Sequence, residues 1–206
     1  MADPLFAAGF LAGSALILSW LFNWGMRWLA PRIGLVDVPA GRKAHKAPTP
    51  LGGGIAIWLA TVLVITAGGL LAHRFRPDVA EAAAAVLQRI QADQSRILLV
   101  FGLGTLLLVM GLLDDVFGLP WKIRLAVQVG LASVLVASGV RLTLFPPIST
   151  IPLLAGSITV LWIVALTNAF NFLDNMDGLA AGVALIAGLL LAGAQLLAGE
   201  VVVPGV

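Results

Sequence analysis

The stretch Thr167–Leu179, TNAFNFLDNMDGL, places amides and carboxylates between two long apolar runs. Asn168, Asn171, Asp174 and Asp177 recur there at every third residue. An aspartate in the middle of a bilayer costs roughly 3 kcal/mol, so such a cluster is expected at the membrane edge or beside a wet cavity. Either place suits a site for a polar ligand.

The apolar run before this stretch is expected to be helical. The helical repeat then determines which of the polar side chains lie on the same face. If the helix continues through the stretch, Asn168, Asn171 and Asn175 share one face, because residues three and four apart are neighbours. Asp174 would lie beside that face. The pattern therefore predicts a surface of hydrogen-bond acceptors and carboxylates at a helix end.

The composition is that of a membrane protein. Of 206 residues, 60% are hydrophobic and 11% charged, with a mean hydropathy of +1.05, which excludes an ordinary soluble domain. The apolar runs lack period-two alternation, which argues against a transmembrane barrel. We expect an all-α, polytopic protein with one membrane domain over residues 1–206. Nothing in the sequence predicts a nucleic-acid partner, and the absence of cysteine leaves the redox compartment unreadable.

About six apolar segments are predicted to cross the membrane. They are Pro4–Phe22, Ile55–Ala72, Ile97–Leu113, Ile123–Val140, Leu153–Thr167 and Leu179–Ala198. The first lacks the basic start of a cleaved signal and is expected to be retained. Between the second and third spans, His73–Ser95 predicts a short amphipathic helix on the membrane surface.

The distribution of basic residues predicts the orientation. Placing the loops after spans one, three and five inside gives them seven Lys and Arg, against five in the outer segments. This arrangement follows the positive-inside rule, with both termini outside and three cytoplasmic motif loops. Trp20, Trp24 and Trp28, spaced by four, indicate either an interfacial aromatic belt or ordinary helix packing.

The first inner loop is basic and leads into a glycine-rich helix start. Arg42, Lys43 and His45 are followed by Thr49–Gly54, TPLGGG. Helix N-termini attract phosphate, and glycines allow close backbone approach. The combination favours phosphate contact, whereas the simpler interpretation is that these charges only set the topology.

The second inner loop carries two adjacent carboxylates, Asp114 and Asp115, directly after an apolar run. Adjacent carboxylates repel, so the pair indicates a bound cation or a well-solvated loop. Mg²⁺ takes few carboxylates together with water and substrate phosphates, which fits this pair.

Three segments in this order resemble the polyprenyl-phosphate N-acetylhexosamine-1-phosphate transferases, members of glycosyltransferase family 4. They are RKAHKAPTPLGGG (42–54), GLLDDVFGL (111–119) and NAFNFLDNMDGLAAG (168–182). The resemblance implies transfer of an N-acetylhexosamine 1-phosphate from a UDP-sugar to polyprenyl (undecaprenyl) phosphate, with release of UMP. It also implies a Mg²⁺ cofactor, a bacterial inner (cell) membrane location with a cytoplasmic active site, and a role in making cell-envelope polysaccharide. A homodimer is left open.

By resemblance, the site residues fall into three overlapping groups. The catalytic candidates are Asp114, Asp115, Asp174 and Asp177. The metal candidates are Asp114, Asp115 and Asn171. The substrate-binding candidates are Arg42, Lys43, His45, Asn168, Asn171 and Asp174.

Further residues indicate which branch of the family the sequence resembles and how much of the family fold it covers. Gly118 stands where the muramoyl-pentapeptide branch typically has lysine, and the first loop resembles the N-acetylglucosamine-1-phosphate branch. Family members are longer and carry a Gly-Asp-x-Gly motif and a histidine-containing loop, which this sequence lacks. The chain is therefore expected to match the N-terminal part of the family fold, and to turn over slowly or not at all alone.

Two other function classes are open at this stage. An ion-coupled transporter also uses carboxylates within the membrane, although it places them near the midplane on interrupted helices. A non-catalytic subunit that binds the lipid carrier would share the motifs. For the transferase, the choice between direct attack by the lipid phosphate and a covalent aspartyl-phosphate intermediate is also open.

Overall fold

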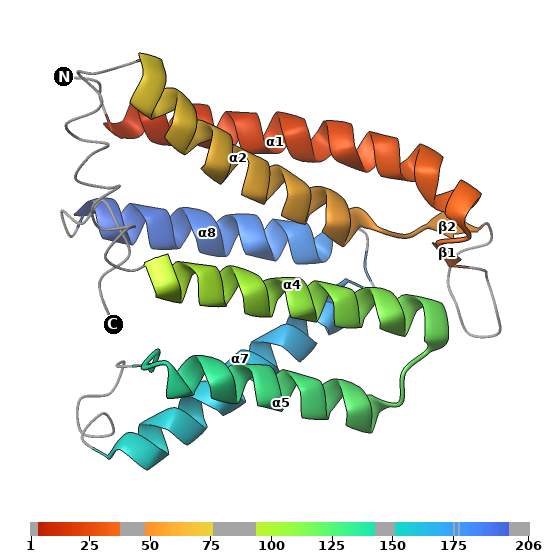
Figure 1. The fold of residues 1–206 in the computed structure, drawn as a ribbon, viewed down its shortest axis with the longest axis vertical. Helices are drawn as coiled ribbons and strands as arrows, with labels where there is room; N and C mark the ends of the chain where they lie inside the picture. Colours follow the sequence, from red (N-terminus) through yellow and green to blue (C-terminus); the bar gives the residue numbers. More distant parts are fainter. Residues whose placement is uncertain are drawn as a thin grey trace. The chain divides into compact units, whose positions relative to one another are not determined.

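The computed structural model describes residues 4–37, 48–75, 94–142, 151–174, 176 and 178–197. Within these residues the chain is almost entirely helical (Figure 1). Its elements are α1 (Pro4–Leu29), the 3-10 helix η1 (Ala30–Ile33), β1 (Val36–Asp37), β2 (Thr49–Pro50), α2 (Gly53–Phe75), α4 (Gln94–Phe117), α5 (Trp121–Ala137), α7 (Pro152–Leu173) and α8 (Leu179–Leu197).

The expected all-α class is confirmed, and each predicted span falls on one of six described α-helices. Three helical segments are long and apolar enough to cross a membrane, namely Gly9–Ile33, Ser95–Phe117 and Pro152–Leu173. Shorter apolar helical segments cover Gly53–Ala67 and Leu179–Ala194. The sidedness of the termini and loops stays a prediction, and most of the expected surface helix lies outside the described residues.

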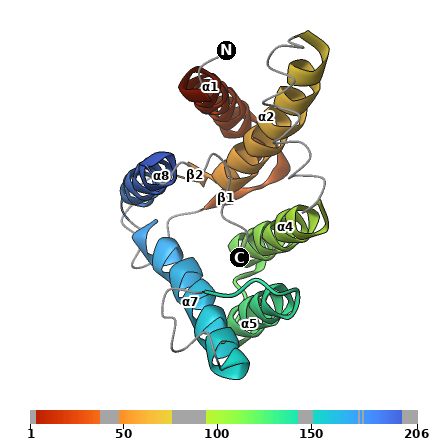
Figure 2. The ribbon, with the colours of Figure 1, turned by 90° about the vertical axis from the view of Figure 1, so that its left-hand side faces the viewer.

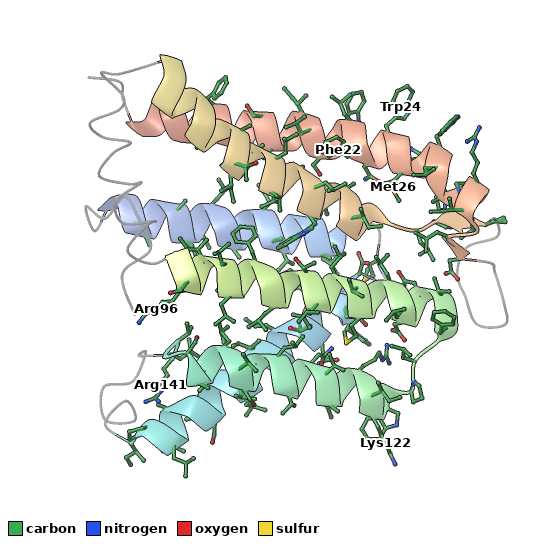
Figure 3. All side chains as sticks on the ribbon, in the orientation of Figure 1. Phe22, Trp24, Met26, Arg96, Lys122 and Arg141 are labelled. Atoms are coloured by element: carbon green, nitrogen blue, oxygen red, sulfur yellow. The ribbon has the colours of Figure 1, made fainter. Side chains whose placement is uncertain are left out.

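The chain divides into two compact units, Met1–Leu119 and Pro120–Val206, which are described separately. In the first unit, α1 lies along α2 (Figures 1 and 2). Met26 points from α1 toward α2, whereas Trp24 lies on the outer side (Figure 3). Trp20, Trp24 and Trp28 are 67%, 69% and 64% exposed, so most of each side chain is left uncovered by this unit. Their exposure favours the interfacial belt over the packing interpretation.

Residues directly after α1 end the helix and stabilise its C-terminus. Pro31 enters η1, and Gly34 adopts a left-handed conformation with φ +76°. Arg32 donates from Nη1 to the Trp28 carbonyl, and its guanidinium lies 3.5 Å from the centroid of the Trp28 ring. A cation at a helix C-terminus complements the dipole there. The antiparallel pair β1–β2 follows and joins the chain immediately before and after the basic loop.

Small residues let α2 approach α4 in the first unit. The Trp58 ring lies over Gly104, where an added Cβ would come within 3.3 Å of it, and contacts Phe101 at a centroid distance of 5.3 Å. Leu108 similarly fills the space above Gly54. Large side chains thus pack on glycine faces, as is common between membrane helices.

In the second unit, α7 crosses α5 (Figures 1 and 2). Small buried residues line the contact, since Ala132, Ala155 and Gly156 are all buried. Val136 would lie 3.1 Å from a Cβ at Gly156, so the helices approach too closely for a larger residue. Lys122 and Arg141 lie at opposite ends of α5 (Figure 3), as expected if this helix spans the membrane.

Candidate functional site

The two adjacent aspartates lie in the last turn of α4, just before the segment that connects α4 to α5 in the sequence. Asp114 is half-buried and Asp115 is exposed. The turn is closed by Gly118, whose N–H donates to the Asp114 carbonyl at 2.8 Å. Gly118 has a φ of +61°, a conformation that glycine adopts without steric cost. Gly118 therefore serves the turn that follows the aspartate pair.

The Asp114 side chain also holds the turn. Its Oδ1 accepts a hydrogen bond of 2.9 Å from the Leu119 N–H. Both carboxylates lie at the negative end of the helix dipole, where a further negative charge is disfavoured by about 0.3–1 kcal/mol. A bound cation would offset that repulsion.

The donor set at this helix end fits Mg²⁺. Within residues 4–37, 48–75, 94–142, 151–174, 176 and 178–197, no three His, Cys, Asp or Glu side chains gather around one metal position. Mg²⁺ commonly binds through one or two carboxylates and completes its shell with water and substrate phosphates. Asp114 and Asp115 supply that minimal set.

The second polar cluster lies at the end of α7. The helix ends at Leu173, and Asp174 caps it with an N–H that donates to the Phe170 carbonyl at 3.0 Å. Gly178, at φ +74°, then turns the chain into α8. The helix therefore stops before Asn175, and of the three asparagines proposed for one helical face only Asn168 and Asn171 lie on α7.

The exposed side chains of this cluster are Asn168, Asn171 and Asp174. They occupy the last two turns of α7 and its cap, at the end of an apolar helix. Asp177, the remaining catalytic candidate, lies outside the described residues, as does Asn175. The described part of the cluster therefore presents two amides and one carboxylate.

Asn168 makes a contact that the sequence did not predict. Its Nδ2 donates to Gln128 Oε1 of α5 at 2.6 Å and to the Val164 carbonyl at 2.8 Å. Gln128 is only 6% exposed. A lone glutamine inside an apolar span was a signal available from the sequence, since polar residues within membrane helices are rare and usually partnered.

The basic loop residues Arg42, Lys43 and His45 lie outside the described residues. The glycines that follow them have packing roles. Gly52 has φ +99°, and a Cβ there would lie 2.5 Å from Met26 Cε, while one at Gly54 would lie 3.2 Å from Leu108. Gly53 has nothing within 4 Å of a Cβ position. Close packing thus accounts for Gly52 and Gly54, and only Gly53 is open to a ligand.

The predicted site residues divide between the two units. Asp114 and Asp115 belong to the first, whereas Asn168, Asn171 and Asp174 belong to the second. The predicted metal set of Asp114, Asp115 and Asn171 draws on both and stays a prediction. A surface hollow is lined by Trp24, Gly25, Arg27 and Trp28, and none of the site residues that the structure describes is among them.

Comparison with known proteins gives a family and a set of relatives. Residues 97–204 match the model of glycosyl transferase family 4. The probable undecaprenyl-phosphate N-acetylglucosaminyl 1-phosphate transferase of Bacillus subtilis is 32% identical over 163 residues, covering 77% of this chain and 40% of the relative. No solved structure gives a significant match.

Two further relatives carry related names. The decaprenyl-phosphate N-acetylglucosaminephosphotransferase of Mycobacterium tuberculosis is 32% identical over 193 residues, 90% of this chain and 45% of the relative. The undecaprenyl-phosphate alpha-N-acetylglucosaminyl 1-phosphate transferase of Escherichia coli is 27% identical over 184 residues, 84% of this chain and 43% of the relative. The chain thus spans less than half the length of these relatives.

Proposed function

The chain belongs to glycosyl transferase family 4, and we propose that it acts in transferring N-acetylglucosamine 1-phosphate from a UDP-sugar to polyprenyl phosphate. One observation carries the proposal: the family match over residues 97–204 contains both polar helix ends, the aspartate pair of α4 and the asparagine cluster of α7. The names of the relatives support a polyprenyl-phosphate acceptor and N-acetylglucosamine as the sugar.

In the proposed reaction, an oxygen of the lipid phosphate attacks the sugar-bearing phosphorus of the UDP-sugar. A new phosphorus–oxygen bond forms, the bond from that phosphorus to the bridging oxygen breaks, and UMP leaves with the electron pair. A lipid diphosphosugar remains. Because one phosphoanhydride replaces another, the reaction needs no ATP.

The main barrier is charge, because an anionic phosphate must approach an anionic diphosphate. The second pKa of a phosphate monoester is about 6, so the lipid nucleophile is already mostly dianionic near neutral pH. A strong general base adds little. We therefore assign Asp114 and Asp115 to metal binding or positioning, in preference to a covalent aspartyl phosphate.

Mg²⁺, when bound, would supply a positive charge that neutralises the reacting phosphates. Asp114 and Asp115 are the residues that would hold it, and Asn171 is proposed to complete the set. Asp114 Oδ1 already accepts the Leu119 N–H, which fixes that carboxylate in one orientation. This hydrogen bond makes Asp114 a pre-organised ligand.

The exposed groups on α7 suit recognition of the donor. Asn171 and Asp174 offer amide and carboxylate groups that match sugar and uracil hydrogen bonds. We propose that Arg42, Lys43 and His45 contact phosphate and that Asp177 completes the donor pocket. This arrangement requires the site to lie at the cytoplasmic face of a bacterial cell membrane, where a soluble UDP-sugar can meet a membrane lipid.

The function is tested by an exchange assay in membranes that contain the chain and a second polypeptide, the region of the Bacillus subtilis relative that the match leaves uncovered. Radiolabelled UMP should enter UDP-N-acetylglucosamine only when Mg²⁺ and the lipid diphosphosugar are present, because the reverse reaction regenerates the donor. Membranes without the chain are the control. Ion-dependent flux with no exchange would contradict the transferase and support the transporter.

A further inference from the structure

A polar pair joins α5 and α7 within an otherwise apolar contact. Asn168 Nδ2 donates to Gln128 Oε1 at 2.6 Å and to the Val164 carbonyl at 2.8 Å. Gln128 is 94% buried among apolar neighbours, since its exposed fraction is 6%. A buried amide is unfavourable unless it is hydrogen-bonded, so the bond to Asn168 helps to accommodate a glutamine at that position.

The Val164 carbonyl sets the direction of the pair. A backbone carbonyl only accepts, so the Asn168 atom beside it must be the amide nitrogen. The same nitrogen faces Gln128, which must therefore present its oxygen. Both amides are thus held in one orientation, and the Asn168 oxygen is directed away from both partners.

The other described contacts hold α7 farther from its C-terminal end. Thr159 Oγ1 accepts the Leu142 N–H at 3.0 Å, and Val136 packs on Gly156. The bond between Gln128 and Asn168 acts in the last two turns of α7. Asn168 is three residues before Asn171 and five before the helix end at Leu173. Successive residues are about 100° apart around a helix, so a small rotation moves Asn171 and Asp174 together.

We propose that Gln128 is a positioning residue: by holding Asn168, it fixes the rotation of the last two turns of α7 and so aims Asn171 and Asp174 at the substrate. This inference rests on the proposed function. Gln128 itself is buried beneath the helix and acts only through Asn168. Asn168, in turn, offers the substrate its amide oxygen, since its nitrogen is already engaged.

The test uses three variants of the full chain. Gln128→Met keeps the length of the side chain and removes the acceptor. Gln128→Glu keeps an acceptor oxygen at the same distance and is the rescue variant, because burial favours the uncharged form of its carboxyl group. Ser133→Ala is the matched control, because Ser133 lies on the same helix, is exposed and bonds only the Val129 carbonyl of α5.

Two readouts are combined. The chain contains four asparagines, so selective ¹⁵N-asparagine labelling gives four side-chain amide signals, and that of Asn168 is assigned by its loss in Asn168→Asp. The second readout is kcat and KM for UDP-N-acetylglucosamine, normalised to folded protein and measured with the region of the Bacillus subtilis relative that the match leaves uncovered present as a second polypeptide.

We expect Gln128→Met to shift the Asn168 and Asn171 amide signals, to lower kcat about tenfold or more, and to raise KM for UDP-N-acetylglucosamine, because Asn171 and Asp174 are proposed to contact the donor. Gln128→Glu should restore both readouts toward wild type, and Ser133→Ala should change neither. Wild-type kcat in Gln128→Met, or an equal loss in Gln128→Glu, would overturn the inference. If the wild type transfers nothing even with the second polypeptide, the proposed function fails, and the amide signals alone decide. Unchanged Asn168 and Asn171 signals in Gln128→Met then overturn the positioning role, and shifted ones support it.

Discussion

The Asp114 carboxylate accepts a hydrogen bond of 2.9 Å from the backbone N–H of Leu119, five residues further along the chain. This bond ties the last turn of α4 to the start of the segment leading into α5. Asp114 therefore has a structural role as well as its proposed role at the metal. Asp115 lies beside it and is exposed.

The two roles of Asp114 can be separated by substitution. Asp114→Ala removes both the acceptor and the charge and should lower the free energy of unfolding by about 1–2 kcal/mol. Asp114→Asn keeps an acceptor oxygen and removes a charge from the negative helix end, so its stability should stay close to wild type. Thermal unfolding in detergent measures the difference, and equal stability of both variants would contradict the structural role.

Asp115 should affect activity without affecting the fold. Asp115→Asn should lower Mg²⁺-dependent transfer on the order of 10²–10³-fold, by analogy with the loss of one pre-organised stabilising group. Asp78→Asn, outside the predicted site, is the control and should be nearly neutral. Full activity in Asp115→Asn would remove the aspartate pair from the mechanism, and equal losses at both positions would indicate general destabilisation.

The glycines at the start of α2 should differ in how they tolerate a side chain. Gly52→Ala forces a side chain into a left-handed conformation and against Met26, and should cost about 2 kcal/mol or more. Gly53→Ala meets nothing within 4 Å and should leave the stability unchanged or slightly raised. A loss of transfer in Gly53→Ala at full stability would support phosphate approach at this glycine. Unchanged stability in Gly52→Ala would contradict the packing role.

The fold could be predicted largely because its signals are local. Long apolar runs fix the positions of the membrane helices, and the acids that follow Leu113 and Leu173 mark the ends of α4 and α7. The end of α7 was harder to place, because its three-residue polar spacing suits a continuing helix as well as a turn. In the structure, α7 ends at Leu173 and Gly178, with a positive φ, turns the chain into α8.

The site was predicted less completely, because its supports are long-range. The bond between Gln128 and Asn168 joins residues 40 apart, and no spacing rule connects them. The roles of Gly52 and Gly54 were likewise missed, since Met26 and Leu108 fill the space above them from other helices. A glycine needed for packing and one needed for phosphate look alike in a sequence.

The predicted topology can be measured directly because the chain has no native cysteine. Single cysteines at Ala44, Phe117 and Asn175 should be protected from an impermeant thiol reagent outside intact cells, and one at Ala84 should react. Phe117 serves as the reporter for its loop because it is 72% exposed, whereas Gly118 has a left-handed backbone that disfavours a side chain. Labelling of Phe117 and Ala84 from the same side would break the six-span topology.

The central claim is that this chain supplies carboxylates for sugar-phosphate transfer to a lipid, and product formation tests it most directly. The purified chain is incubated with radiolabelled UDP-N-acetylglucosamine, polyprenyl phosphate and Mg²⁺. The incubation is run with and without a second polypeptide, the region of the Bacillus subtilis relative that the match leaves uncovered. We predict little turnover by the chain alone, and with both polypeptides a labelled lipid diphosphosugar and UMP in equal amounts, both lost in Asp115→Asn. No product with both polypeptides, or the same product from the second polypeptide without this chain, would contradict the account.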